Sequence, residues 1–158
     1  MINFKAVFHV IGVLLLVLSG LILITIPVSI YYASHDGLSL LAAAGLTALI
    51  GATLWYTSKD EDKKVGKREG YLIVAFGWVA MASCSMLPYL FSGVLTNVAD
   101  ALFESASGLT TTGATILEDI EKIPKDILFW RSLTQWIGGM GIIVLTVAIF
   151  PLLGIGGV

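Results

Sequence analysis

The sequence is poor in cysteine, histidine and charge. Of its 158 residues, one is cysteine, two are histidine and 13% are charged. The single cysteine, Cys84, excludes a disulfide framework and a multi-cysteine metal site within the chain, and its apolar setting indicates a small buried side chain. Neither His9 nor His35 lies in the same segment as Ser105 and Ser107, so no nucleophile is paired with a base and no enzyme is expected.

The scarcity of charge accompanies an abundance of apolar residues. Hydrophobic residues make up 57% of the chain and the mean hydropathy is +0.93, a balance foreign to ordinary soluble domains of this length. The formal net charge is only -2, and the one basic cluster is mixed with acidic residues, which argues against a nucleic-acid partner. The sequence therefore predicts an integral membrane protein in contact with lipid.

Four apolar segments are long enough to cross a bilayer, for which about 20 residues suffice. They cover about residues 6–32, 38–56, 71–91 and 127–153. The first is too long for a secretory signal, whose apolar core has roughly 7 to 15 residues, so we expect it to remain as a helix. Open β-structure would leave unpaired edges in lipid, and the alternation typical of barrel strands is missing. An all-α membrane protein is predicted.

The charges between the second and third segments set the expected orientation. Residues 59–69 carry five basic side chains, and basic residues in short loops mark the cytoplasmic side. The N-terminus is then also inside, and the outer side carries three basic and seven acidic residues. These acids either face water or raise the local cation concentration; they are Asp36, Asp100, Glu104, Glu118, Asp119, Glu121 and Asp126.

A short helical pattern and a run of hydroxyl side chains lie between the third and fourth segments. Residues 97–109 repeat apolar and small side chains at spacings of three and four, and Asn97 is a typical N-cap. Such a half-helix, entering from outside, turns its negative carbonyl end toward the membrane midplane. The polar run that follows, residues 110–115, is tolerated at that depth only where it is buried in protein or lines a water-filled path.

This run is predicted to be an ion filter. A monovalent cation that leaves water exchanges its hydration shell for oxygen ligands, which backbone carbonyls supply without net charge. Gly113 gives the backbone the conformational freedom that it needs, and stiff threonines suit an extended run. The spacing from Gly108 to Gly113 also resembles a nucleotide-binding loop, but Ala114 stands where the phosphate-binding lysine would be.

Arg131 lies near the outer start of the fourth segment, where a charged side chain needs a partner. We expect it either to pair with Glu104 on the half-helix and brace the filter, or to extend to interfacial water. Further along the segment, Gly138, Gly139 and Gly141 permit close helix packing or a bend.

The stretch DALFESASGLTTTGATIL, followed by FWRSLTQWIGGMGIIVL, resembles the first pore repeat of the Trk/Ktr/HKT superfamily of potassium uptake proteins, specifically its bacterial TrkH-type members. The resemblance covers about residues 71–158, and the first two helices match an extra N-terminal pair. It implies a potassium-channel-like repeat of helix, pore half-helix and helix in residues 70–158, preceded by a transmembrane helix pair and cytoplasmic loop in residues 1–69. The implied function is potassium translocation.

Carried over residue by residue, the resemblance implies that Gly113 is the filter glycine. Thr111 and Thr112 would then bear the potassium-binding carbonyls, with Thr110 and Ala114 at the borders. Some plant members with serine at the glycine position favour sodium, so Gly113 implies the potassium-favouring form. Potassium is the ligand expected, and no organic cofactor is.

The superfamily carries four repeats on one chain, and a single repeat cannot surround an ion. We therefore expect that this chain is an N-terminal portion of a longer protein or that four copies assemble. The resemblance also implies a cytosolic nucleotide-binding regulatory subunit of the TrkA type, a homodimer of the full-length protein and a place in the bacterial inner membrane. A non-conducting assembly or sensor module, with the run as a packed re-entrant turn, is the alternative.

Overall fold

The computed structural model describes residues 3–34, 36–58 and 66–152; within these ranges it leaves out the side chains of residues 67, 142 and 144–152. The described residues form helices and contain no strand, so the predicted all-α class is confirmed for them. The elements are α1 (Phe4–Leu23), α2 (Ile26–Tyr31), α3 (Gly37–Thr57), α4 (Lys67–Ser85), α5 (Leu87–Phe91), α6 (Val98–Leu109), the 3-10 turn η1 (Ile120–Lys122) and α7 (Lys125–Leu152).

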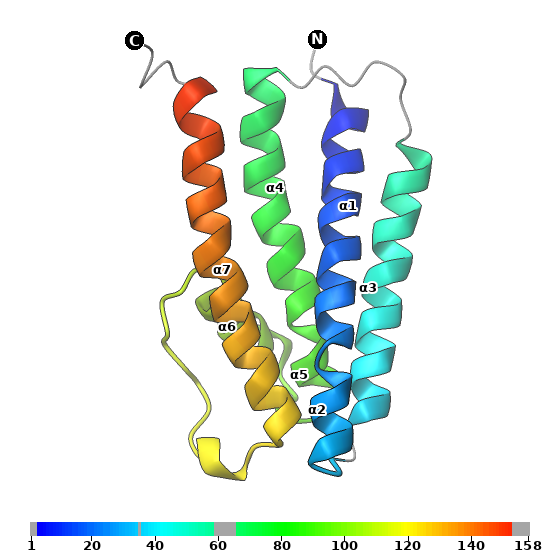
Figure 1. Ribbon diagram of the computed structural model, residues 1–158, viewed down its shortest axis with the longest axis vertical. Coiled ribbons are helices and arrows are strands. Elements are labelled where there is room, and N and C mark those ends of the chain that lie inside the picture. Colours follow the sequence, from blue (N-terminus) through cyan, green and yellow to red (C-terminus); the bar gives the residue numbers. More distant parts are fainter. Residues whose placement is uncertain (1–2, 35, 59–65, 153–158) are drawn as a thin grey trace.

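The long helices α1, α3, α4 and α7 stand side by side, with the short helix α6 beside the lower half of α7 (Figure 1). The start of α1 and the far end of α7 lie at the same end of the bundle, while η1 lies at the opposite end (Figure 1). Most of the predicted cytoplasmic loop, residues 59–65, lies outside the described residues. The structure describes the last four residues of this loop, 66–69. There α4 begins at Lys67, one turn before Tyr71, the predicted start of the third apolar segment.

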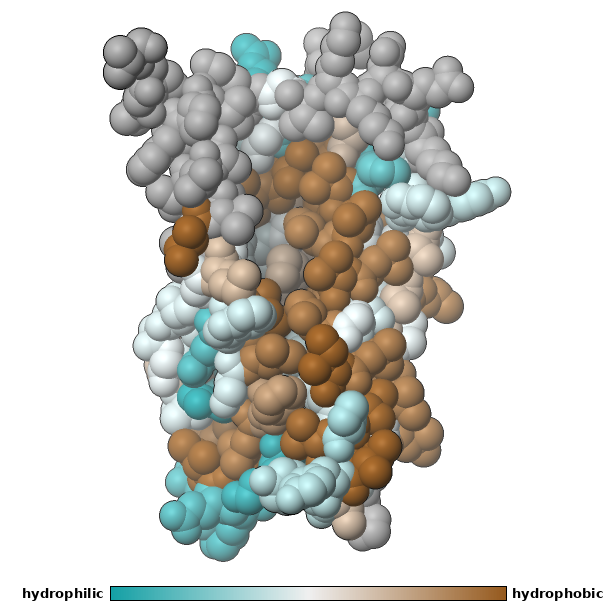
Figure 2. Space-filling view, viewed as in Figure 1, coloured by the Kyte–Doolittle hydropathy of each residue, from teal (hydrophilic) through white to brown (hydrophobic). Residues whose placement is uncertain are grey.

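Three spans in the described part are long and apolar enough to cross a membrane: Phe4–Tyr31, Gly37–Thr57 and Arg68–Phe91. They correspond to three of the four predicted segments. The fourth, α7, has 28 residues, about 42 Å at 1.5 Å per residue, but the side chains of its last third are not described and its span stays a prediction. Brown, apolar side chains cover most of the middle of the visible face (Figure 2), as lipid contact requires.

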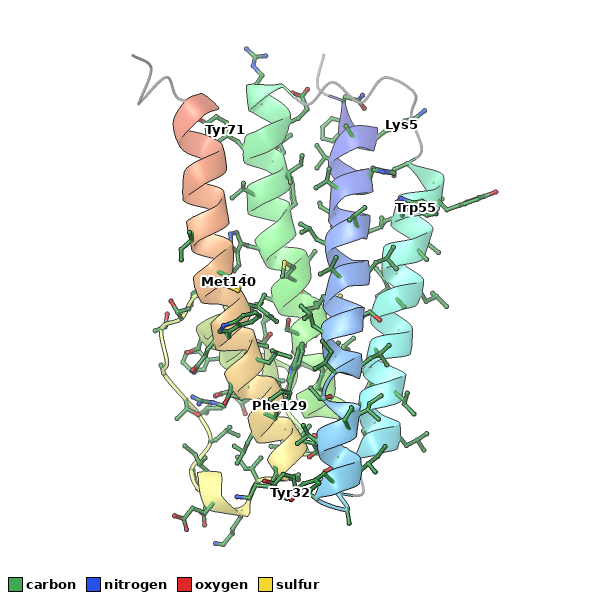
Figure 3. The ribbon with its side chains drawn as sticks, in the orientation of Figure 1. Lys5, Tyr32, Trp55, Tyr71, Phe129 and Met140 are labelled. Atoms are coloured by element: carbon green, nitrogen blue, oxygen red, sulfur yellow. The ribbon has the colours of Figure 1, made fainter. Side chains whose placement is uncertain are left out.

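Aromatic side chains lie near both ends of this apolar region. Tyr32 lies at one end of the bundle, whereas Trp55 and Tyr71 lie toward the other (Figure 3). All three are at least one-third exposed. Tyrosine and tryptophan are enriched at the two membrane–water interfaces, because one part of each ring system is apolar and another part is polar. Their placement fits a bundle that crosses the membrane along its long axis.

Two of the apolar spans each contain a proline near which the helix is interrupted. α1 ends at Leu23 and α2 begins at Ile26, just before Pro27; α4 ends at Ser85 and α5 begins at Leu87, just before Pro88. Proline has no N–H to donate, so the carbonyl four residues before it loses its helical partner. The helix therefore stops and restarts at each position.

α6 and α7 both form hydrogen bonds to α4 close to the break between α4 and α5. The indole Nε1–H of the fully buried Trp130, on α7, donates to the carbonyl oxygen of Ser85 at 3.1 Å. One turn earlier on α4, the Ala82 carbonyl accepts from the Ser105 hydroxyl of α6 at 2.8 Å. Because both bonds use backbone oxygens on one stretch of α4, this stretch fixes α6 and α7 relative to each other.

We predict that Trp130→Phe lowers the free energy of unfolding by about 1–3 kcal/mol, because it leaves the Ser85 carbonyl without a donor in an apolar environment. The matched control is Trp136→Phe on the same helix; Trp136 is 60% exposed, and its substitution should change stability by at most about 0.5 kcal/mol. Thermal unfolding in detergent measures both, and equal losses would contradict a special role for the indole bond.

Candidate functional site

The polar run leaves the end of α6 partway along the bundle. α6 begins after Asn97, whose side-chain oxygen accepts from the Ala99 N–H at 3.0 Å, so the predicted N-cap is confirmed. The chain leaves α6 near the mid-height of α7 and then runs down to η1 (Figure 1), where Figure 2 shows it as pale and teal atoms at the left. Residues 110–116 are all exposed, so the predicted filter run forms one open edge of this chain.

The backbone of the run has an unusual conformation. The sign of φ alternates from Thr110 to Gly113: it is negative at Thr110, +57° at Thr111, negative at Thr112 and +77° at Gly113. A positive φ at a β-branched residue such as Thr111 is rare and costs about 1–2 kcal/mol. Alternating left- and right-handed residues turn successive peptide groups to the same side, which an ordinary strand does not do.

Bonds from the last turn of α6 hold the start of the run. The N–H groups of Thr110, Thr111 and Thr112 donate to carbonyl oxygens of α6 at 2.9–3.0 Å. The Thr111 hydroxyl donates to the Thr110 carbonyl at 2.7 Å, and the Thr110 and Thr112 hydroxyls lie 2.8 Å apart. The amide hydrogens at the start of the run are thus directed into α6.

Two side chains one turn apart on α6 hold the far end of the run. The buried Ser107 hydroxyl donates to the Ala114 carbonyl at 2.6 Å. The Glu104 carboxylate accepts from the Thr115 hydroxyl and from the Ile116 N–H, each at about 3.0 Å. On one face of α6, Ser107 therefore donates to a carbonyl of the returning chain, and Glu104 accepts from a hydroxyl and an amide of the same chain.

The predicted pair between Glu104 and Arg131 is present. Arg131 Nε and Glu104 Oε1 lie 2.5 Å apart, with Glu104 only 1% exposed and the arginine side chain 17% exposed. Charge-assisted bonds of this length are the strong ones, and a carboxylate with three partners is well compensated for its burial. Glu104 consequently links α6, the end of the run and α7.

The carbonyl oxygens of Thr111, Thr112 and Gly113 differ from their neighbours. The Thr110 and Ala114 carbonyls each accept a hydroxyl hydrogen bond, whereas none of the described residues donates to the three oxygens between them. A backbone carbonyl with no partner at membrane depth is costly unless an ion or water satisfies it. The arrangement can therefore offer consecutive neutral oxygen ligands to a cation.

The outer acids do not form a single exposed group. Glu118, Asp119 and Glu121 are exposed around η1, where Asp119 pairs with Lys122 at 2.5 Å. Asp126 is instead fully buried in the first turn of α7, and its Oδ1 accepts from the Ile127 N–H at 3.0 Å. With Glu104 buried as well, the expectation of seven acids facing water or attracting cations fails for these two, because both carboxylates face into the protein.

Three bonding roles in the site were not predicted from the sequence: those of Ser107, of Ile116, and of Thr115, which was placed in the polar run without a partner. Ser107 follows Glu104 by three residues, and this spacing places both side chains on one helix face. That spacing was the available signal. Thr115 and Ile116 carried none, because their partners lie eleven and twelve residues away and are reached only through the reversal of the chain.

Comparison with known proteins agrees with this architecture. Residues 39–158 match the family model TrkH, described as a cation transport protein. The chain is 42% identical over 156 residues to the Trk system potassium uptake protein TrkH of Escherichia coli K12, covering 98% of this chain and 32% of that relative. It is 36% identical to TrkG of the same strain over 154 residues, covering 97% of this chain and 32% of TrkG.

A solved structure is also similar. The crystal structure of the potassium transporter TrkH from Vibrio parahaemolyticus superposes with a TM-score of 0.92 at 39% identity, covering 99% of this chain and 34% of that one. The fold and its apolar spans thus define a multi-pass membrane protein. The chain belongs to the TrkH family, and it spans about a third of the length of the curated relatives that it matches.

We predict that Glu104→Gln lowers the free energy of unfolding by about 3 kcal/mol, since removing one member of a buried ion pair leaves the other charge uncompensated. Glu121→Gln, at an exposed position in η1, is the matched control and should change stability by at most about 0.5 kcal/mol. Thermal unfolding in detergent gives both values. If Glu104→Gln and Arg131→Met had additive effects in the double variant, a direct interaction would be contradicted.

Proposed function

We propose that the chain supplies one repeat of a potassium-translocating pore and that the carbonyl oxygens of Thr111, Thr112 and Gly113 bind the permeating ion. The observation that carries the proposal is the set of three consecutive carbonyls without a donor among the described residues, between neighbours whose carbonyls are engaged. Thr110 and Ala114 then border the site and hold its ends. Relatives named as potassium uptake proteins support the choice of ion.

The position of the run suits a monovalent cation. The carbonyl end of α6 carries about half a negative charge, which stabilises a cation beside it without a side-chain carboxylate. Glu104, the nearest acid on α6, is neutralised by Arg131 and faces the returning chain. Neutral dipoles bind an ion firmly enough to replace its hydration shell and weakly enough to release it. Passage through the site therefore requires no covalent chemistry.

One repeat lines one side of a pore, so the proposal includes three further repeats, in the same or other chains. The exposure of residues 110–116 on one edge supports this requirement. It also includes an inner-membrane location with the N-terminus in the cytoplasm, a regulatory nucleotide-binding subunit of the TrkA type at the end that carries Lys5, and a homodimer of the full-length protein. The concentration of acids around η1 at the opposite end is in line with that orientation.

Gly113→Asp tests the filter directly. In the product of the complete gene that encodes these residues, reconstituted in liposomes, we expect the variant to lose at least about nine-tenths of rubidium or potassium flux, since a carboxylate at the site would hold the cation. Gly93→Asp is the matched control, because Gly93 has a similar φ of +74° and equally open surroundings but lies between α5 and α6. Unaltered flux in Gly113→Asp would favour the non-conducting assembly or sensor module.

Ser107→Ala tests the bond at the Ala114 carbonyl. Its loss frees one end of the run, and we expect the preference for potassium over sodium to fall several-fold. Ser105→Ala is matched to it, since Ser105 is also buried on α6 and also donates to a backbone carbonyl, but on α4. Competition between sodium and rubidium uptake measures the preference. An equal fall in both variants would mean that the bond to Ala114 has no specific role.

A further inference from the structure

α7 approaches α6 very closely where α6 ends. A Cβ atom added at Gly138 would lie 2.0 Å from the Leu109 carbonyl oxygen and 2.6 Å from its carbonyl carbon. Both are backbone atoms, so no side chain could rotate away to make room. The end of α6 would have to move by more than an ångström to restore an ordinary contact of at least 3.4 Å.

A second glycine makes the same contact from the other helix. A Cβ atom at Gly108 would lie 2.6 Å from the Thr134 hydroxyl oxygen, and Thr134 precedes Gly138 on α7 by one turn. Gly108 and Leu109 are the last two residues of α6. The end of the half-helix therefore packs directly against α7 because Gly138 and Gly108 have no side chains.

The contact between the end of α6 and α7 is linked to the polar run through the peptide chain and through packing. Leu109 is fully buried, and the peptide that follows it leads into Thr110. The Gly108 carbonyl accepts from the Thr111 N–H at 3.0 Å. The Thr111 methyl group lies 3.8 Å from the Cβ position of Gly139, which is ordinary contact. A displacement of the end of α6 would therefore move the donor-free carbonyls with it.

We propose that Gly138 is a positioning residue for ion selectivity, and this rests on the proposed function above. The missing side chain lets α7 set how far the end of α6 and the carbonyls of residues 111–113 project into the pore. Arg131 holds α6 two turns earlier through Glu104, so α7 fixes both ends of the last turns of the half-helix. Selectivity depends on the distances between carbonyl oxygens and the ion, which makes it sensitive to this contact.

The test measures the ratio of potassium to sodium permeability in liposomes containing the product of the complete gene. We expect Gly138→Ala to lower the ratio about tenfold or more. Gly12→Ala is the matched control, because a Cβ atom at Gly12 would meet backbone atoms of α3 at 2.7 and 2.8 Å, an equally close helix contact remote from α6. It should lower the unfolding temperature and leave the ratio unchanged. Gly139→Ala, with its 3.8 Å contact, should change the ratio little.

If Gly138→Ala does not fold, the pair Gly108→Ala and Gly108→Ala/Thr134→Ala decides the question. The single variant should lower the ratio, and the double variant should restore it, because the hydroxyl that the new methyl group meets is gone. The proposal is overturned if the ratio stays at the wild-type value in Gly138→Ala or Gly108→Ala, if it is not restored in the double variant, or if it falls equally in Gly12→Ala. Absence of potassium flux in the wild-type protein would instead overturn the proposed function.

Discussion

The buried carboxylate of Glu104 is the point on which the site depends. It lies on the half-helix, accepts from the chain that returns after the polar run, and pairs with Arg131 on the neighbouring long helix. In a medium without water, an ionised group needs all of these partners, and the same requirement fixes the three elements relative to one another. Satisfying this one charge fixes the end of the polar run, at Thr115 and Ile116, against α6 and α7.

The rest of the C-terminal half supports that arrangement through backbone oxygens. Pro88 divides the helix that carries Ser85, and the Ser85 carbonyl receives the indole N–H of Trp130. The Ser105 hydroxyl binds the same helix one turn away. Glycines then allow the closest approach where the half-helix ends. The helices that support the polar run are thus joined by side-chain hydrogen bonds to backbone carbonyls, which lipid could not provide with a donor.

Prediction from the sequence succeeded where the signal was local. Asn97 marks the start of the half-helix, and the apolar segments mark the spans that the structure describes. The interruptions near Pro27 and Pro88 were not predicted, although both residues are visible in the sequence, because an apolar run of membrane length indicates a span and not the turns within it. The pair of Glu104 and Arg131 was found by charge alone, since each ion needed a partner and few were available. The roles of Ser107 and Thr115 were not found, since serine and threonine are compatible with many environments.

The sequence by itself determined that the protein belongs in a membrane and carries a capped half-helix followed by a polar, glycine-containing run. These properties follow from hydrophobicity, helix periodicity and backbone preference, which depend on neighbouring residues. Only the tertiary structure decided which oxygens of the run are engaged and which lack a donor. That outcome depends on a chain reversal that returns residues 114–116 to α6, and the close packing of Gly138 against Leu109 is likewise visible only in the tertiary structure. Both are contacts between distant residues, and no local pattern specifies them.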